Sequence, residues 1–171
     1  DRQELIGRIC ASLIETRGYH TAWVALLDGD RKLRAIAHAG MGERFEALRR
    51  CFEGPEMPPC SRRALECRDI VVSDVPCACP VKRDDSDHAA MTIALRSIAA
   101  TYGFMTVTVS ARYAADAEEQ DLFREVAADV ALALENIAFA ERQRRDEEEI
   151  RSLAKFPSEN PNPVLRIAGD G

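Results

Sequence analysis

The feature that most limits the fold of this chain is a long helical segment near its carboxyl end. From residue 116 onward, apolar side chains recur every three or four positions, which predicts one apolar stripe along an α-helix. The residues of this stripe are Leu122, Val126, Val130, Leu134 and Ile137. Acidic residues at 116, 118 and 119 favour a helix start there, because they face the positive end of the helix dipole.

The segment that follows the stripe, ERQRRDEEEIRSL at 141–153, is almost wholly charged. Only Ile150 and Leu153 continue the apolar period. One helix over 116–152 would be about 55 Å long at a rise of ~1.5 Å per residue, whereas a compact domain of this size is about 38 Å across. We therefore expect the helix to extend beyond its domain and to connect it to another part of a longer protein.

The first forty residues predict a helix followed by a β-hairpin. Residues 2–17 carry apolar side chains at helical spacing, and Gly18 is a typical helix end. Two β-rich runs over 21–40 flank an Asp-Gly-Asp sequence at 28–30. An Asp-Gly pair between apolar runs is a common hairpin turn, so these runs are expected to pair.

The middle of the chain predicts short helices, further strands and one loop. The helices are expected at 42–52 and 60–67, the strands at 70–72, 90–98 and 103–110, and the loop at 73–88. In the last of these strands, Met105, Val107 and Val109 alternate with hydroxyl-bearing residues. That alternation indicates a strand with one face in the core.

Composition and charge exclude several classes of partner. The 171 residues suit one domain with an extension, and a net charge of −6 without a basic, aromatic-rich cluster disfavours nucleic-acid binding. No run approaches the ~20 apolar residues that membrane insertion needs, and no segment has the pattern of a signal peptide. We expect a cytoplasmic protein, and the initial Asp1 favours a segment taken from inside a longer chain.

The order of these elements resembles the GAF domain family. The matching stretches are AWVALLDGDRKLRAIAHAG (22–40), IVVSD (70–74), YGFMTVTV (102–109) and FREVAADVALALENI (123–137). The resemblance covers residues 1–140. It implies an α/β (α+β) fold in which a central antiparallel sheet has helices on one face, a ligand pocket on the other and a long C-terminal signalling helix.

The tail of the chain, SLAKFPSENPNPVLRI at 152–167, resembles the opening of a PAS domain. We therefore expect three parts: a GAF-like sensory domain at 1–140, a charged helical linker at 141–153 and the truncated start of a PAS-like domain at 154–171. The order GAF, helical linker, PAS implies a bacterial multidomain sensor, with either a histidine kinase or a cyclic-dinucleotide output domain.

Two ligand classes known in GAF domains are not expected here. The sequence lacks the NKFDE-type motif that accompanies cyclic-nucleotide binding in the family. Bilin-binding members attach the pigment through a cysteine that is usually followed by histidine. In this chain Cys67, Cys77 and Cys79 are followed by Arg, Ala and Pro, so a covalent bilin is not expected.

The cysteines are the least ordinary feature of the composition. Cys60, Cys67, Cys77 and Cys79 lie within twenty residues of one another, and zinc or an iron–sulfur cluster needs about four converging thiolates. These four are therefore candidate metal ligands, although the spacing C-x6-C-x9-C-x-C is not a recognised zinc or ferredoxin pattern. Neighbouring Arg and Lys residues favour thiolates, which suits a redox role for the same side chains.

A structural role for the cysteines is the competing interpretation. Cys10, Cys51 and Cys67 are then small buried hydrophobic residues on helices, and Cys77 and Cys79 are ordinary loop thiols. The stretch VSDVPCAC (72–79) also faintly resembles the catalytic region of free methionine sulfoxide reductases, which share this fold. The Ser-Glu pair of those enzymes is replaced by His-Ala-Ala at 88–90.

We expect the ligand pocket to be lined by the strands and by segment 54–90. The candidate ligand-binding residues are Trp23, His38, Met91, Ile93 and Met105. His38 follows a strand and titrates near neutral pH in its ordinary state. Alternation along 90–98 predicts that Arg96 faces solvent. The sequence identifies neither the ligand nor a cofactor, because pocket chemistry varies widely on one scaffold.

The expected function is a regulatory small-molecule-sensing module without catalytic activity of its own. A cysteine-based redox or metal sensor and a reductase enzyme remain alternatives. The expected protein partner is a second copy of the chain, since residues 2–17 and 120–140 carry apolar stripes that can pair across a two-fold axis. The charged stretch 141–149 would then flank a parallel coiled coil.

Overall fold

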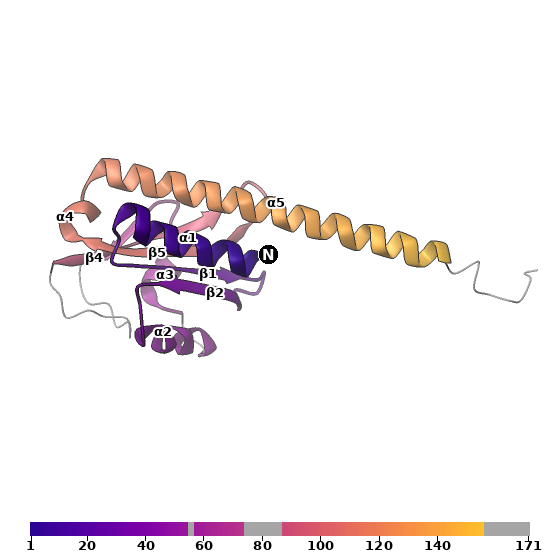
Figure 1. Ribbon diagram of the computed structural model, residues 1–171, viewed down its shortest axis with the longest axis horizontal. Helices are drawn as coiled ribbons and strands as arrows, with labels where there is room; N and C mark the ends of the chain where they lie inside the picture. The colour runs from indigo at the N-terminus through magenta and orange to yellow at the C-terminus, as the bar shows by residue number, and fades with distance from the viewer. Residues whose placement is uncertain (55–56, 74–86, 156–171) are drawn as a thin grey trace, which may run out of the picture. The chain divides into compact units, whose positions relative to one another are not determined.

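A five-stranded antiparallel sheet lies at the centre of the fold. The computed structural model describes residues 1–54, 57–73 and 87–155. The strands are β1 (Thr21–Leu27), β2 (Leu33–Ala39), β3 (Val71–Ser73), β4 (His88–Arg96) and β5 (Thr101–Ser110). Their order across the sheet is β2-β1-β5-β4-β3 (Figure 1). β1 and β5 are far apart in sequence and form its centre.

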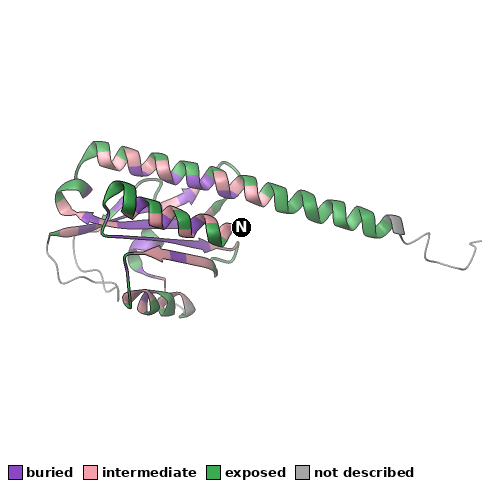
Figure 2. Ribbon diagram, viewed as in Figure 1, coloured by how far each residue is buried: buried purple, intermediate pink, exposed green. Residues whose placement is uncertain are grey.

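The chain divides into two units, Asp1–Glu135 and Asn136–Gly171. The sheet belongs to the first unit. Helix α5 (Ala117–Lys155) begins in the first unit and ends in the second, and its side chains over 139–153 are exposed (Figure 2). The region predicted to open a PAS domain lies outside the described residues from 156 onward, so that assignment stays a prediction.

The register of the strands assigns the sheet's side chains to two faces, because directly opposed residues project to the same side. Ala22, Val24 and Leu26 of β1 oppose Val107, Met105 and Gly103 of β5. This face is covered by α1 (Arg2–Arg17) and by residues 117–135 of α5 (Figure 1). We call the cluster on this side the α1–α5 core.

Helix α1 occupies the predicted residues, and both of its ends have local causes. The Asp1 carboxylate accepts a hydrogen bond from the Gln3 amide at 3.0 Å, which caps one free donor of the first turn. Gly18 ends the helix in the left-handed conformation, at φ 68°, and donates to the Ile14 carbonyl. Ile6, Cys10 and Leu13 are buried along one side of the helix, as a stripe at helical spacing requires.

The long predicted helix is confirmed, but its buried side is turned slightly from the expected stripe. Phe123 and Ala127 are buried against the sheet, whereas Leu122 and Val126 are only half-buried. Val130 and Leu134 belong to the predicted stripe and are buried as expected. Phe123 is the largest apolar side chain in this stretch, and its burial sets the rotation of the helix on the sheet.

The opposite face of the sheet is covered by α2 (Arg44–Glu53) and α3 (Pro59–Glu66) (Figure 1). Its buried cluster, here called the aromatic core, consists of Trp23, Ala25, Met41, Leu48 and Phe104. Both helices fall where the sequence predicted helices. α3 begins at Pro59, directly after Pro58. Proline suits this first helical position, because an amide there would have no partner within the helix.

The β1–β2 hairpin is confirmed, with one difference in its turn. The Asp28 carboxylate accepts hydrogen bonds from the amides of Asp30 and Lys32, at 3.0 and 2.9 Å. The left-handed residue of the turn is Arg31, at φ 61°, and not Gly29. The short helix α4 (Ala111–Ala114) was not predicted. No helix in the described part of the chain combines the length and apolar content needed to cross a bilayer.

Gly103 is the position where the central strand pair tolerates no side chain. Its φ of 148° is a conformation that other residues rarely adopt. A Cβ placed there would lie 2.0 Å from the Ala25 carbonyl oxygen of β1. The close approach of β5 to β1 therefore requires glycine at this site.

We predict that Gly103→Ala destabilises the protein by about 3 kcal/mol or more, because it adds backbone strain to a main-chain clash in the central pair. Urea unfolding followed by circular dichroism measures the change. Gly29→Ala is the control: nothing lies within 4 Å of its Cβ position, so a change of less than about 0.5 kcal/mol is expected. Equal effects of the two substitutions would contradict the assignment.

Candidate functional site

The aromatic core forms a wall of rings on the α2–α3 side of the sheet. The ring centroid of Trp23 lies 5.3 Å from that of Phe104 and 6.0 Å from that of Phe52, both in edge-to-face geometry. Phe52 stacks on Phe104 at 5.9 Å. Trp23 projects to this face because side chains alternate along β1, so that its neighbours Ala22 and Val24 project to the other face.

His38 lies next to this wall on β2, directly opposite Trp23 in the register. Its imidazole stacks on Phe45 of α2 at a centroid distance of 3.9 Å. Its Nδ1 is buried and has no hydrogen-bond partner among the described residues. Burial lowers the pKa of His38 below its usual value, so the ring is mainly neutral at neutral pH.

Threonine hydroxyls continue the same face toward β4. Thr92 and Thr106 are buried and oppose one another in the register, with their hydroxyl oxygens 3.1 Å apart in a hydrogen bond. Thr21 is buried as well and donates to the Thr108 hydroxyl at 2.8 Å. Ser61 of α3, which is fully buried, packs on this side of the sheet. We call these five residues, Thr21, Ser61, Thr92, Thr106 and Thr108, the hydroxyl cluster.

The structure separates the five predicted ligand-binding residues. Trp23 belongs to the aromatic core and His38 lies beside it, whereas Met91, Ile93 and Met105 belong to the α1–α5 core on the other face. The sequence showed that Met91 and Ile93 project to one face of β4 and Thr92 to the other, but it did not show which of these faces α3 covers. The hydroxyls of Thr92 and Thr106 are therefore the members of the site that sequence reasoning missed.

The prediction that Arg96 faces solvent was wrong. The residue is half-buried, and its guanidinium donates from Nη2 to the Leu65 carbonyl near the end of α3. Alternation placed Arg96 correctly on the side opposite to Leu95. That side is covered by α3, so the positive charge meets a helix carbonyl at the C-terminal end, where cations are favoured.

The described cysteines have different surroundings. Cys10 is buried and donates to the Ala37 carbonyl at an Sγ–O distance of 3.6 Å, and burial raises the pKa of its thiol to about 12. Cys10 is thus a structural residue, as one interpretation held. Cys51 is half-buried and Cys67 is exposed at the end of α3, so Cys67 is not the buried residue that this interpretation expected.

The predicted metal set is only partly described. Cys60 is buried in the first turn of α3 and Cys67 lies just beyond its last turn, about 10 Å farther along at ~1.5 Å per residue. Cys77 and Cys79 lie outside the described residues. Within the described ranges, no group of three or more His, Cys, Asp or Glu residues could hold a metal ion. A four-cysteine site stays a prediction.

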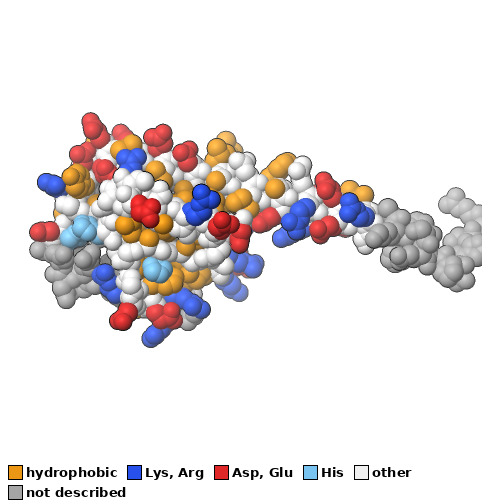
Figure 3. Space-filling model, in the orientation of Figure 1, with side chains coloured by type: hydrophobic (Ala, Val, Ile, Leu, Met, Phe, Trp, Pro, Cys, Tyr) orange, Lys and Arg blue, Asp and Glu red, His pale blue; other side chains and the backbone are white. Residues whose placement is uncertain are grey.

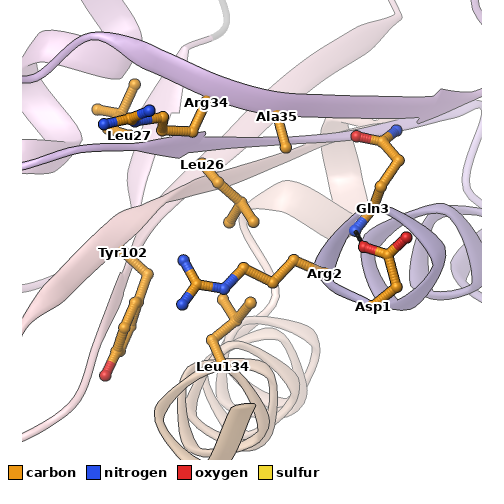
Figure 4. A pocket seen from close by; sticks show the side chains of 9 residues that line it. All are labelled: Asp1, Arg2, Gln3, Leu26, Leu27, Arg34, Ala35, Tyr102 and Leu134. Carbon is orange, nitrogen blue, oxygen red and sulfur yellow. Dashed lines mark hydrogen bonds between the residues drawn. The ribbon is translucent and has the colours of Figure 1, made fainter. Parts of the chain in front are cut away.

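A pocket of about 240 Å³ opens on the α1–α5 side of the sheet (Figure 4). It is lined by Asp1, Arg2, Gln3, Leu26, Leu27, Arg34, Ala35, Tyr102 and Leu134. Figure 4 shows the Arg2 side chain extending between Leu26 and Leu134 toward Tyr102. Two of its polar side chains already have partners: Gln3 donates to the Ile36 carbonyl and Arg34 pairs with Asp28.

The fold, with its central sheet between two helical layers, leads to the family. The GAF domain family matches residues 1–135 of the sequence. This chain belongs to the GAF domain family. GAF domains commonly act as sensory and regulatory modules of signalling proteins, and they are generally non-catalytic. No curated protein matches the sequence.

Solved GAF structures share the fold at low sequence identity. One is the GAF domain/HD domain protein from Geobacter sulfurreducens, at 14% identity and a TM-score of 0.62, covering 81% of this chain and 95% of that one. Another is the GAF-B domain of DevS from Mycobacterium smegmatis, at 18% identity and 0.55, covering 85% and 98%.

A third similar structure is a domain of a Sinorhizobium meliloti 1021 protein assigned as a two-component sensor histidine kinase. It is 14% identical, with a TM-score of 0.58, and the match covers 83% of this chain and 95% of that one. At such identities the likeness establishes the fold alone. The chemistry of this GAF domain has to come from its own residues.

We predict that Thr106→Val destabilises the domain by about 1–3 kcal/mol, because it leaves the buried Thr92 hydroxyl without its partner. The double variant Thr92→Val/Thr106→Val should cost less than the sum of the single variants, since it leaves no orphaned hydroxyl. Urea unfolding measures all three, with the exposed Thr101→Val as control. Strict additivity would show that the two hydroxyls do not interact.

Proposed function

We propose that this GAF domain is a regulatory small-molecule-sensing module of a bacterial signal-transduction protein, with its ligand on the α2–α3 side of the sheet. The observation that supports this proposal most directly is the hydroxyl cluster: buried threonine and serine hydroxyls lie beside the aromatic core, between the sheet and its covering helices. A helix packed on a sheet is best served by an apolar interface, so these hydroxyls call for an explanation beyond packing.

Ligand recognition supplies that explanation. Small-molecule sites combine apolar and aromatic walls with a few convergent polar groups. Trp23 and Phe104 provide the wall, and each threonine hydroxyl retains acceptor capacity after bonding its neighbour. His38 adds a buried ring nitrogen. The arrangement suits a small, uncharged, partly aromatic ligand with a few hydrogen-bonding groups.

The proposed role is regulatory and not catalytic. The alternative of a cysteine-based redox or metal sensor involves Cys60 and Cys67, of which one is buried and the other exposed at opposite ends of α3. It also involves Cys77 and Cys79, which lie outside the described residues. The reductase alternative depends on the VSDVPCAC stretch, most of which lies outside the described residues.

We predict that a screen of small heterocyclic and aromatic compounds, followed by Trp23 fluorescence, finds a ligand that changes the emission of this single tryptophan. Thr92→Val/Thr106→Val should weaken that ligand about tenfold or more, because two hydrogen bonds to it are lost. Thr101→Val, exposed on the same strand β5, is the matched control. Unchanged binding in the double variant would place the ligand elsewhere, and the pocket of Figure 4 would be tested next through Tyr102→Phe.

The output is proposed to leave through α5 toward a PAS-like domain and a histidine kinase or similar effector. Structural similarity to a domain assigned to a sensor histidine kinase supports that context. We further propose that the chain forms a homodimer through its helices. The stripe of α1 and that of residues 117–135 are used against their own sheet, so the pairing surface has to come from what remains exposed on α5.

The exposed apolar residues of α5 share one heptad register. They are Leu132, Phe139, Ile150 and Leu153, exposed by 56%, 56%, 67% and 65%. With Leu132, Phe139 and Leu153 at d, Ile150 takes position a, and Asn136 and Gln143 take the preceding a positions. Asp146 takes the d position between Phe139 and Leu153, so the seam is apolar at its two ends and polar in between. Uncharged polar residues at a are compatible with a two-stranded coiled coil and fix its register.

Charge supports a parallel arrangement of this seam. Figure 3 shows acidic and basic side chains along the last turns of α5, with apolar side chains between them. In the same register Arg142 occupies position g and Glu147 position e of the next heptad. Two parallel copies in register would place these opposite charges next to each other across the seam.

We predict that light scattering at micromolar concentration gives twice the chain mass of 19.0 kDa. Phe139→Asp should shift the protein to the monomer, because it removes an apolar d residue and, with Asp146 at the next d position, leaves two consecutive d positions charged. Arg145→Asp places the same charge on the outer position c and should leave the dimer intact. A wild-type monomer would remove the dimer, and equal loss in both variants would remove the proposed seam.

A further inference from the structure

The turn between α3 and β3 joins the two sides of the sheet. Only residues 67–70 separate the end of α3 from the start of β3. Leu65, before the turn, packs against the aromatic core, whereas Ile70, after it, packs against the α1–α5 core. Because β3 is an edge strand, the turn carries the chain around the edge of the sheet from the proposed ligand side to the side of α5.

Asp69 in this turn forms an ion pair with Arg124 of α5. The Arg124 Nε donates to Asp69 Oδ1 at 2.8 Å. Asp69 Oδ1 also accepts the Ile70 amide at 2.7 Å, which ties the carboxylate to the backbone that enters β3. The hydrogen bond from Arg124 lowers the pKa of Asp69, so the carboxylate is ionised at neutral pH.

Arg124 is held in position by its own helix. Its Nη1 donates to Asp121 Oδ1 at 2.6 Å and its Nη2 to Gln120 Oε1 at 3.4 Å. Gln120 in turn donates to the Ala114 carbonyl at 2.7 Å. The guanidinium therefore points at Asp69 in a fixed orientation, which a guanidinium fork provides and a flexible ammonium does not.

A second polar contact fixes the same part of α5 from another direction. The Tyr19 hydroxyl, in the turn before β1, donates to the Glu119 carboxylate. Glu119 and Arg124 are five positions apart and so lie about 140° from each other around the helix axis, at ~100° per residue. With Glu119 held by Tyr19, a displacement of Asp69 would turn the helix about its axis as well as shift it.

The other end of the turn is fixed to the ligand side. Arg96 of β4 donates to the Leu65 carbonyl in the last turn of α3, and the Cys67 amide donates to the Arg63 carbonyl at 2.8 Å. A movement of α3 on the sheet would thus be transferred to residues 67–70 and to Asp69.

We propose that the Asp69–Arg124 contact is the link that passes a displacement of α3 to α5, with Arg124 as the positioning residue of the signalling helix. This inference rests on the proposed function, because it takes the α2–α3 side as the ligand side. The regulated event is a rotation of α5, driven by a ligand that moves α3 and limited by the Tyr19–Glu119 contact.

Hydrogen exchange of the full chain without ligand tests the link. Arg124→Gln should increase exchange over 59–73, and Asp69→Asn over 120–127, each by the roughly two- to fivefold that breaking an exposed ion pair allows. The double variant should exchange no faster than the faster single variant, because both substitutions break one contact. Arg124→Lys keeps the charge but not the fork, and it repeats the test if the Gln variant does not fold.

Arg34→Gln is the matched control, since it breaks the Arg34–Asp28 pair at 3.2 Å in the β1–β2 hairpin, where Arg34 is exposed and Asp28 half-buried. It should leave exchange over 59–73 unchanged. Effects confined to the mutated element, or an equal effect of the control, would overturn the link. The fluorescence screen tests the ligand side separately. A ligand that binds at the hydroxyl cluster, without the expected exchange effects, would contradict the Asp69–Arg124 link but not the ligand side. The expected exchange effects, without a ligand at the hydroxyl cluster, would contradict the ligand side but not the link.

Discussion

Burial of both faces of the central strand pair is the constraint on which the rest of the structure depends. Six of the seven residues of β1 are buried, and β5 is buried along its middle. A one-residue slip between these strands would exchange the side chains of the two cores. The close main-chain approach at Gly103 is part of this pairing. One backbone ladder therefore aligns the ring wall on one side with the helix contacts on the other.

The elements of the fold were predictable where the apolar period was long or the turn chemistry strong. Helix α1, the hairpin and the long helix α5 followed from such patterns. The rotation of α5 did not, because Phe123 lies outside the stripe through Leu122 and Val126 and only packing shows which is buried. Helix α4 is too short to produce a period, and its position depends on the chain on either side of it.

The candidate site was only partly predictable, for a related reason. Alternation along β4 divides Met91 and Ile93 from Thr92, but it does not reveal which set meets α3. Apolar residues were therefore chosen for the pocket, and the hydroxyl pair of Thr92 and Thr106 was overlooked. The environment of Arg96 was predicted wrongly for the same reason. The pattern within a strand cannot show that a helix from elsewhere in the chain covers its polar side.

The threonines of the hydroxyl cluster have hydrogen-bond partners without a ligand, since they pair with each other, Thr21 with Thr108 and Thr92 with Thr106. An incoming molecule would exchange existing hydrogen bonds for new ones, and the net gain from such exchange is small. Binding energy would then come mainly from contact with the rings, and residence would be short. Under the proposed function, such a receptor would follow the rise and fall of its ligand's concentration and would not act as a store for that ligand.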